Sequence, residues 1–356
     1  MSLTANEVQR NNLLASDWMH RGIDLANENS EATLERAVRC FDEAIALRRT
    51  LPLEDNAFFR YGLSAGWINR GDAMARMGTS HALNEAVKSY DEALVLLESL
   101  PLEENKLYPR RLAITWINRG MALQRQEGSN GKRDVLDCFR KAIEVLEHPS
   151  AHEIADRSSL LAGAWGNLAG RLMSSDQEGA RFAARQALAL VQASERIDLV
   201  SAEIGLKARH LLCGLAVSDI AGKKALSKDE VSVATDAVDE AMALLRHWKF
   251  QGESELTKLT LEIFRFGCRV YESCQPHFLA EFLTECLEPE LFGKAIPLQR
   301  EILDAAQAAI WGAAGNLQPG GFGFFSTSHF EPFLSEIEDL RKVEEKLNQL
   351  RLAQAV

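Results

Sequence analysis

The sequence "WINRG" stands at residues 67–71 and again at residues 116–120, so the two copies are 49 residues apart. The same step leads back from Trp67 to Trp18, within "WMHRG", and forward from Trp116 to Trp165, within "WGNLAG". Fixed internal periods of this size are typical of repeat proteins, in which one structural unit stacks on the next. The period therefore favours a stack of similar units over two or three separate globular domains.

Each unit is predicted to contain two helices. In residues 54–78, Trp67, Gly71 and Met74 recur at i, i+4 and i+7, which places them on one stripe of a helix. A second apolar stripe with helical spacing runs through residues 81–100. The intervening "GTS" and the following "LPLEEN" are typical of helix breaks. The unit is therefore a helical hairpin that ends in a proline-bearing loop.

Small and large residues recur together within these hairpins. A glycine inside a helix costs about 1 kcal/mol relative to alanine, so its recurrence requires a reason, and we expect a close approach of a neighbouring backbone. Alanines on the second helix offer matching shallow positions, and bulky aromatic residues fill the space between. The residues expected to form this repeated core are Trp18, Gly22, Phe41, Ala44, Trp67, Gly71, Tyr90, Ala93, Trp116, Gly120, Phe139, Ala142 and Trp165.

The unit resembles the tetratricopeptide repeat, whose signature is W-x2-[LG]-G-x2-Y, followed by A-x3-F-x2-A and by proline. Here the first half reads "WINRGDAM" from Trp67, the second reads "AVKSYDEA" from Ala86, and Pro101 follows. The resemblance covers residues 10–195 clearly and extends in weaker form to residue 316. It departs from the family in its length, because the family repeat has about 34 residues. This chain is thus similar to a long-helix variant of the family.

A second departure is an arginine directly before the repeated glycine, where the family often has leucine. These residues are Arg21, Arg70 and Arg119. Acidic pairs on the second helices, at residues 42–43 and 91–92, are the expected partners of these arginines.

The resemblance implies an all-α fold: a right-handed superhelical solenoid of about seven antiparallel helical hairpins. We assign residues 5–316 to the repeat array, 317–330 to a loop rich in glycine and phenylalanine, and 331–356 to a C-terminal capping helix. The loop either folds into the end of the array or contacts a partner. The last helix either covers the final apolar face, as repeat arrays require, or joins two copies of the chain in a homodimer.

The resemblance also implies a protein or peptide partner, bound on a concave surface that the first helix of each hairpin lines. In the family, an asparagine two residues before the glycine often bonds the backbone of a bound peptide. The tentative partner-binding residues here are Asn69, Asn118 and Asn167, with His20 at that position in the first unit, and Arg76 and Arg125 further along the same face. The alternative is that these asparagines only bond neighbouring helices.

Composition and motifs bear on the function class. The formal net charge of −11 argues against nucleic acid or an anionic membrane as the partner, because both require a basic footprint. The sequence contains no H-E-x-x-H, phosphate-loop or G-x-S-x-G motif, so we expect no enzyme activity, no metal and no cofactor. His148 and His152 flank a proline, which predicts a surface loop.

We therefore expect a protein-interaction scaffold or adaptor. Two alternatives stay open: a regulatory protein of tetratricopeptide type that senses a peptide or small molecule, and a subunit of a larger enzyme complex. The six cysteines have no paired spacing, and no apolar run approaches the roughly 18 residues that cross a bilayer, so a cytoplasmic location is expected.

Overall fold

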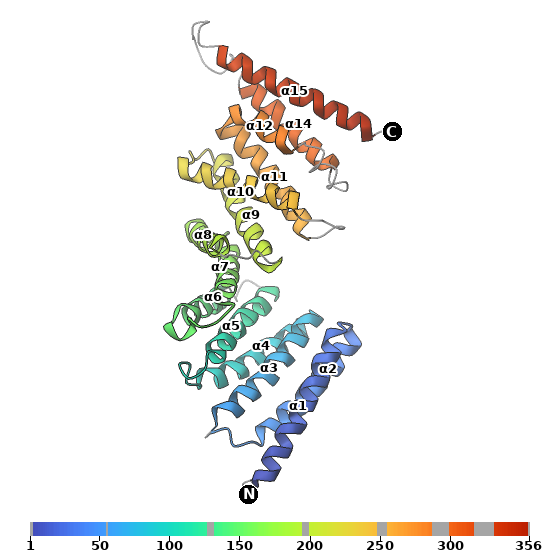
Figure 1. Ribbon diagram of the computed structural model, residues 1–356, viewed down its shortest axis with the longest axis vertical. Coiled ribbons are helices and arrows are strands. Elements are labelled where there is room, and N and C mark those ends of the chain that lie inside the picture. Colours follow the sequence, from blue (N-terminus) through green and yellow to red (C-terminus); the bar gives the residue numbers. More distant parts are fainter. Residues whose placement is uncertain are drawn as a thin grey trace. The chain divides into compact units, whose positions relative to one another are not determined.

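The computed structural model describes residues 3–54, 56–126, 132–193, 199–247, 255–286, 299–316 and 331–354. Within these ranges the regular structure consists of fourteen α-helices and one short 3-10 helix, without a β-strand (Figure 1). From α1 to α7, and again from α9 to α15, each described helix packs on the next one in the chain. The predicted all-α repeat fold is thereby confirmed.

The chain divides into two compact units. The N-terminal unit comprises Met1–Ser175 with Leu190–Ser194, and the C-terminal unit comprises Asp176–Ala189 with Glu195–Val356. The expected 317–330 loop lies outside the described residues.

The N-terminal unit is built from three helical hairpins and one further helix. Its helices are α1 (Ala5–Asn27), α2 (Glu31–Arg49), α3 (Ala57–Met77), α4 (Ser80–Glu98), α5 (Leu107–Arg125), α6 (Lys132–Glu147) and α7 (Arg157–Leu172). Within each hairpin the two helices pack along each other, and each second helix also packs on the first helix of the next hairpin. The first helices additionally contact one another, α1 with α3, α3 with α5 and α5 with α7. The first helices therefore share one side of the stack.

Local sequence signals fix the ends of these helices. Gly78 adopts a φ of 73° and ends α3, a left-handed conformation that glycine adopts without strain. Thr79 caps the N-terminus of α4, because its side-chain oxygen accepts a hydrogen bond from the backbone N–H of Ala82. Helix α5 begins at Leu107, so Pro109 lies in its first turn, where proline is tolerated.

The repeated glycines make room for aromatic rings. A Cβ atom on Gly71 would lie 2.7 Å from the ring of Tyr90, the corresponding distance from Gly120 to Phe139 is 2.8 Å, and Gly22 repeats the arrangement with the ring of Phe41. These rings are fully buried. The feature that approaches each glycine is thus the aromatic side chain of the second helix, where the sequence favoured a backbone. The repeat alanines Ala44, Ala93 and Ala142 are also completely buried.

The tryptophans lie closer to the surface than the sequence indicates. Trp116 is buried, whereas Trp18, Trp67 and Trp165 are half-buried. The guanidinium of Arg21 lies 5.2 Å from the ring centroid of Trp18. An indole is too large to be enclosed readily between two hairpins, so cationic side chains cover the part of the ring that the core leaves open.

The arginines before the glycines join successive hairpins. Arg70 of α3 pairs through Nε with Asp42 of α2 at 2.8 Å, and its Nη1 donates to Ser89 of α4 at 2.7 Å. Arg119 of α5 repeats the ion pair with Asp91 of α4 at 2.6 Å. The expected pairing with acids is confirmed at these two positions.

The C-terminal unit contains the remaining helices. These are α8 (Gln177–Gln192), α9 (Leu199–Ala221), α10 (Lys228–His247), α11 (Glu255–Cys274), α12 (Pro276–Cys286), α14 (Gln299–Asn316) and α15 (Glu331–Gln354). The last three residues of α8, 190–192, fall in the N-terminal unit. Helix α11 packs against α9, α10, α12 and α14, and α15 packs on α12 and α14. Leu340, Val343 and Leu347 of α15 are buried in the core of this unit. Within the unit, α15 thus covers apolar side chains of α12 and α14.

Candidate binding face of the first helices

One side of each first helix in the N-terminal unit keeps its side chains at least partly exposed. On α3, Gly71 faces Tyr90 of α4 and Gly66 faces Ile45 of α2. The remaining stripe carries residues at i, i+4, i+7 and i+11, which share one side of a helix. Together with the equivalent positions 49 residues away, we define the first-helix face as Ser16, His20, Ile23, Asn27, Ala65, Asn69, Asp72, Arg76, Ile114, Asn118, Met121, Arg125, Gly163, Asn167 and Gly170. All of these residues are at least partly exposed.

The asparagines of this face have different surroundings. Asn118 donates through Nδ2 to Oδ1 of Asp72 at 3.0 Å. Asn69 and Asn167 have no hydrogen-bond partner among the described residues. The reason lies one repeat earlier, because the position that Asp72 occupies for Asn118 is Ile23 for Asn69 and Met121 for Asn167. An aliphatic side chain and a thioether offer no comparable acceptor, so two half-buried amides keep their donors and acceptors available.

Asp72 lies at the centre of a small polar network. Its Oδ1 also accepts a hydrogen bond from the hydroxyl of Tyr90 at 2.6 Å. Burial raises the pKa of Asp72, and the hydrogen bonds from Tyr90 and Asn118 partly offset that effect. Burial, followed by the neighbouring carboxylate, raises the pKa of Tyr90. Tyr90 therefore stays a donor, and this part of the face is committed to holding α3, α4 and α5 together.

The two arginines of the face reach back to the preceding hairpin. Arg76 donates through Nε to Oδ1 of Asn29 at 2.9 Å, and Arg125 donates through Nη1 to the carbonyl of Ala75 at 2.7 Å. Each guanidinium has five N–H donors, so these bonds occupy only part of its capacity. Both side chains are exposed, as is His20. Contacts between these residues and an acidic ligand stay a prediction.

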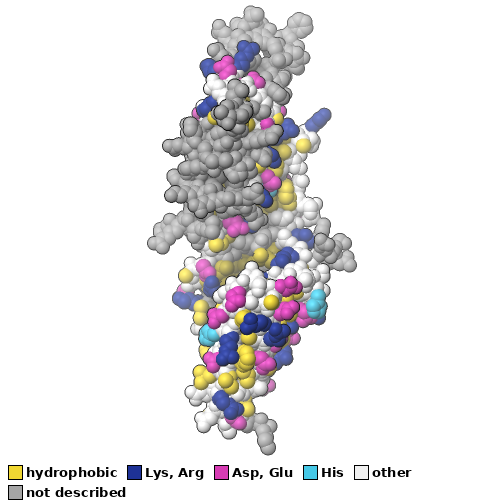
Figure 2. Space-filling model, turned by 90° about the vertical axis from the view of Figure 1, so that its right-hand side faces the viewer, with side chains coloured by type: hydrophobic (Ala, Val, Ile, Leu, Met, Phe, Trp, Pro, Cys, Tyr) yellow, Lys and Arg dark blue, Asp and Glu magenta, His cyan; other side chains and the backbone are white. Residues whose placement is uncertain are grey.

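Two apolar side chains on the face were not singled out by the sequence. Ile23 is 39% exposed and Met121 is 46% exposed, at equivalent positions of α1 and α5. Ile23 and Met121 lie 49 residues before and after Asp72, so the repeat period could have identified them as members of this face. Figure 2 shows that basic, acidic and hydrophobic side chains are interspersed over the surface of the N-terminal unit, in the lower part of the view. The face is thus chemically mixed, with amide, charged and apolar groups within one stripe.

The described residues offer no arrangement for metal chemistry. No group of three or more His, Cys, Asp or Glu residues among them could hold a metal ion. The six cysteines are free thiols, and five of them are buried. Of the helices that the structure describes, none is long and apolar enough to cross a membrane.

Comparisons with known proteins give little further information. No family model matches the sequence, and no curated protein matches it. Among solved structures, the chain matches a "circular tandem repeat protein with novel repeat topology and enhanced subunit contact surfaces", with a TM-score of 0.29 and 14% sequence identity. That match covers 97% of this chain and 84% of the other. The chain is a helical-repeat protein by the packing of its own helices.

Proposed function

We propose that the protein is a non-enzymatic scaffold or adaptor of tetratricopeptide type, which holds a segment of a partner protein on the first-helix face. The observation that carries this proposal is the pair of unpartnered, half-buried amides at Asn69 and Asn167, next to the exposed side chains of Ile23 and Met121. Structural residues in a stacked array normally satisfy one another, as Asn118 and Asp72 do.

A polypeptide is the ligand class that matches this set of groups. A side-chain amide donates and accepts at once, which suits the alternating N–H and C=O groups of a peptide backbone. Ile23 and Met121 offer apolar contact, and the thioether of methionine adapts to different side chains. Arg76 and Arg125 supply free donors for a carboxylate. Because the groups are spread over four helices, they suit an extended segment better than a small molecule.

The test is affinity capture from a lysate of the source cells with two matched variants. Met121→Arg places a charge on the face, whereas Val95→Arg makes the same change on α4, outside the face, where Val95 is 70% exposed. We expect a protein that the wild-type chain and Val95→Arg both capture and that Met121→Arg captures at least about tenfold less, the size of effect that one interface residue produces.

Equal capture by both arginine variants would rule out the first-helix face as the binding surface. A second variant, with Asn69 and Asn167 both changed to alanine, addresses the amides directly. It is expected to weaken the same capture without lowering the thermal melting temperature, because neither amide bonds to another described residue. Capture that survives this double change would contradict the role of the amides.

A further inference from the structure

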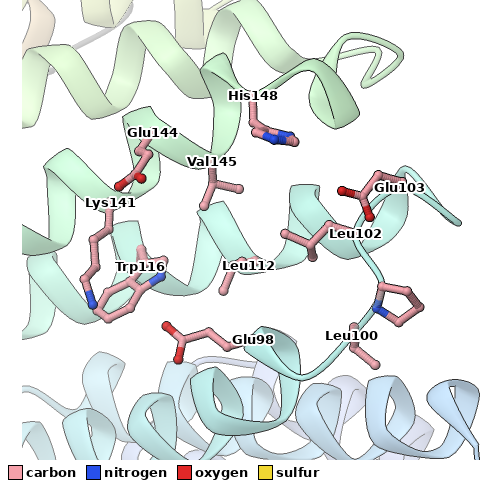
Figure 3. Close-up of a pocket in the computed structure, with 11 residues that line it drawn as sticks. Glu98, Leu100, Leu102, Glu103, Leu112, Trp116, Lys141, Glu144, Val145 and His148 are labelled. Atoms are coloured by element: carbon pink, nitrogen blue, oxygen red, sulfur yellow. The ribbon is translucent and has the colours of Figure 1, made fainter.

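The N-terminal unit has a pocket on another side of α5, away from the first-helix face (Figure 3). Trp116 and Asn118 are about 200° apart around the helix axis, so the pocket that Trp116 lines does not belong to the first-helix face. The volume of the pocket is about 440 Å³. That size lies within the range of about 300–1,000 Å³ that is usual for ligand sites.

Three segments build this pocket. Helix α5 contributes Leu112 and Trp116, one turn apart, and the loop after α4 contributes further apolar side chains, among them Leu100. The last turns of α6 contribute Lys141, Glu144 and Val145, at i, i+3 and i+4, and His148 follows directly after the helix. Glu98 lies across the pocket from them, at the lower edge of the view, and Glu103 lies at its right-hand side, below His148. The result is an apolar floor with charged groups around it.

The preceding repeat has no such open arrangement of charges. There, the guanidinium of Arg49 lies 4.9 Å from the centroid of Trp67 and 3.8 Å from the carboxylate of Glu92. The residues 49 positions later are Glu98 and Lys141, so both charges are reversed.

In the third repeat the cation again lies over the tryptophan, but the reversed charges do not form an ion pair. The ammonium of Lys141 lies 4.1 Å from the centroid of the Trp116 ring. Glu98, Glu103 and Glu144 have neither an ion pair nor a hydrogen bond with any other described side chain. Their negative charge is therefore not neutralised within this part of the protein.

Helix α4 ends at Glu98 and helix α6 ends at Glu147, so both helices end beside the pocket. Arginines already serve carbonyl groups at these two ends: Arg157 donates to the carbonyl of Leu146 and Arg60 donates to that of Ser99. The negative charge of the pocket therefore comes from its side chains. Against the three carboxylates stands one ammonium group, that of Lys141. The pocket is thus complementary to a positive charge.

We propose that this pocket binds a segment of another protein in which an aliphatic residue is followed by a lysine or arginine. The aliphatic side chain packs on Leu112 and Val145, and the cation pairs with Glu98 and Glu144. A polypeptide fits better than a free amine because the apolar floor and the acidic rim together match two adjacent side chains. This site is independent of the first-helix face, and either proposal can fail without the other.

The test uses the full chain with ¹⁵N-labelled tryptophan and follows the indole N–H signals by NMR. The probe is the dipeptide Ac-Leu-Arg-NH2, and a Trp116→Phe sample assigns the Trp116 signal. We expect a saturable shift of that signal, with the signal of Trp67 unchanged. Ac-Leu-Glu-NH2 is expected to bind about tenfold more weakly, because it sets like charges together. Ac-Gly-Arg-NH2, which lacks the aliphatic side chain, is also expected to bind more weakly.

Two matched charge exchanges complete the test. Glu98→Arg with Lys141→Glu copies the closed pair of the preceding repeat and should remove the shift. Arg49→Glu with Glu92→Lys makes the reverse exchange at Trp67 and should leave the response of Trp116 intact. All four side chains are exposed, so both variants are expected to keep the melting temperature of the wild type. The proposal is overturned by the absence of a saturable shift in the wild type, by equal binding of either control dipeptide, or by unchanged affinity after the Glu98 and Lys141 exchange.

Discussion

The close packing of a helix glycine against an aromatic ring can be tested by adding one methyl group at the glycine. In Gly71→Ala, the new Cβ would lie 2.7 Å from one ring carbon of Tyr90 and 3.0 Å from two others. The ring has little freedom to move away, because it is 1% exposed and its hydroxyl is bonded to Asp72 at 2.6 Å. Overpacking of a tight core costs about 1–3 kcal/mol.

The same substitution also has a favourable effect, which a control isolates. Replacing glycine by alanine inside a helix gains roughly 0.5–1 kcal/mol. A Cβ on Gly170 of α7 would meet no atom within 4 Å, so Gly170→Ala should show this gain alone. We expect Gly170→Ala to stabilise the N-terminal unit, and Gly71→Ala to destabilise it by up to about 2 kcal/mol.

Urea unfolding followed by tryptophan fluorescence measures both changes. Four of the six tryptophans lie in the N-terminal unit, so the signal reports mainly on that unit. The difference between the two variants, about 1–3 kcal/mol, is the energy of the steric conflict. If Gly71→Ala proved as stabilising as Gly170→Ala, the claim that the glycine exists to admit the ring would be refuted.

Two further predictions concern charges. Burial raises the pKa of Asp72 in the folded state, so ionisation of Asp72 lowers the stability of the fold as the pH rises through that pKa. The substitution Asp72→Asn should therefore raise the melting temperature at pH 7. Near pH 3 it should bring no gain, because the carboxyl group is then protonated in both the folded and the unfolded state. A gain of equal size at both pH values would contradict this. In the C-terminal unit, Arg181 and Asp219 form a buried ion pair. Asp219→Ala should cost about 3–5 kcal/mol and the double change of Arg181→Met with Asp219→Leu distinctly less, as measured by denaturant unfolding; equal costs would show that the pair is not coupled.

Much of the N-terminal unit could be predicted from the sequence. The 49-residue period and the apolar spacing led to paired helices, and the structure has them from α1 to α6. The pairing of Arg70 and Arg119 with acids on the preceding second helices also followed, because the charged residues recur in the same register. Such features depend on positions along one helix or on the equivalent position in the next repeat, and both can be read from spacing.

The asparagines show where spacing was insufficient. Asn69, Asn118 and Asn167 occupy equivalent positions, yet only Asn118 has an acceptor in front of it. Whether each asparagine has a partner depends on one residue of the preceding repeat, at the position that Asp72 occupies for Asn118. That residue differs from repeat to repeat. The pocket beside Trp116 was missed for a related reason, because the sequence assigned Trp116 to the core alone and treated His148 as part of a surface loop.

The sequence by itself determined the helical hairpins, their order and the residues that repeat, because the 3.6-residue turn and the 49-residue step are both properties of a linear chain. Only the tertiary structure decided what each repeated residue touches. Tyr90 rather than a backbone fills the space at Gly71, and Lys141 lies on Trp116 where Arg49 lies on Trp67. The physical reason is that a contact between stacked hairpins depends on two side chains from different repeats, and the repeats are similar without being identical.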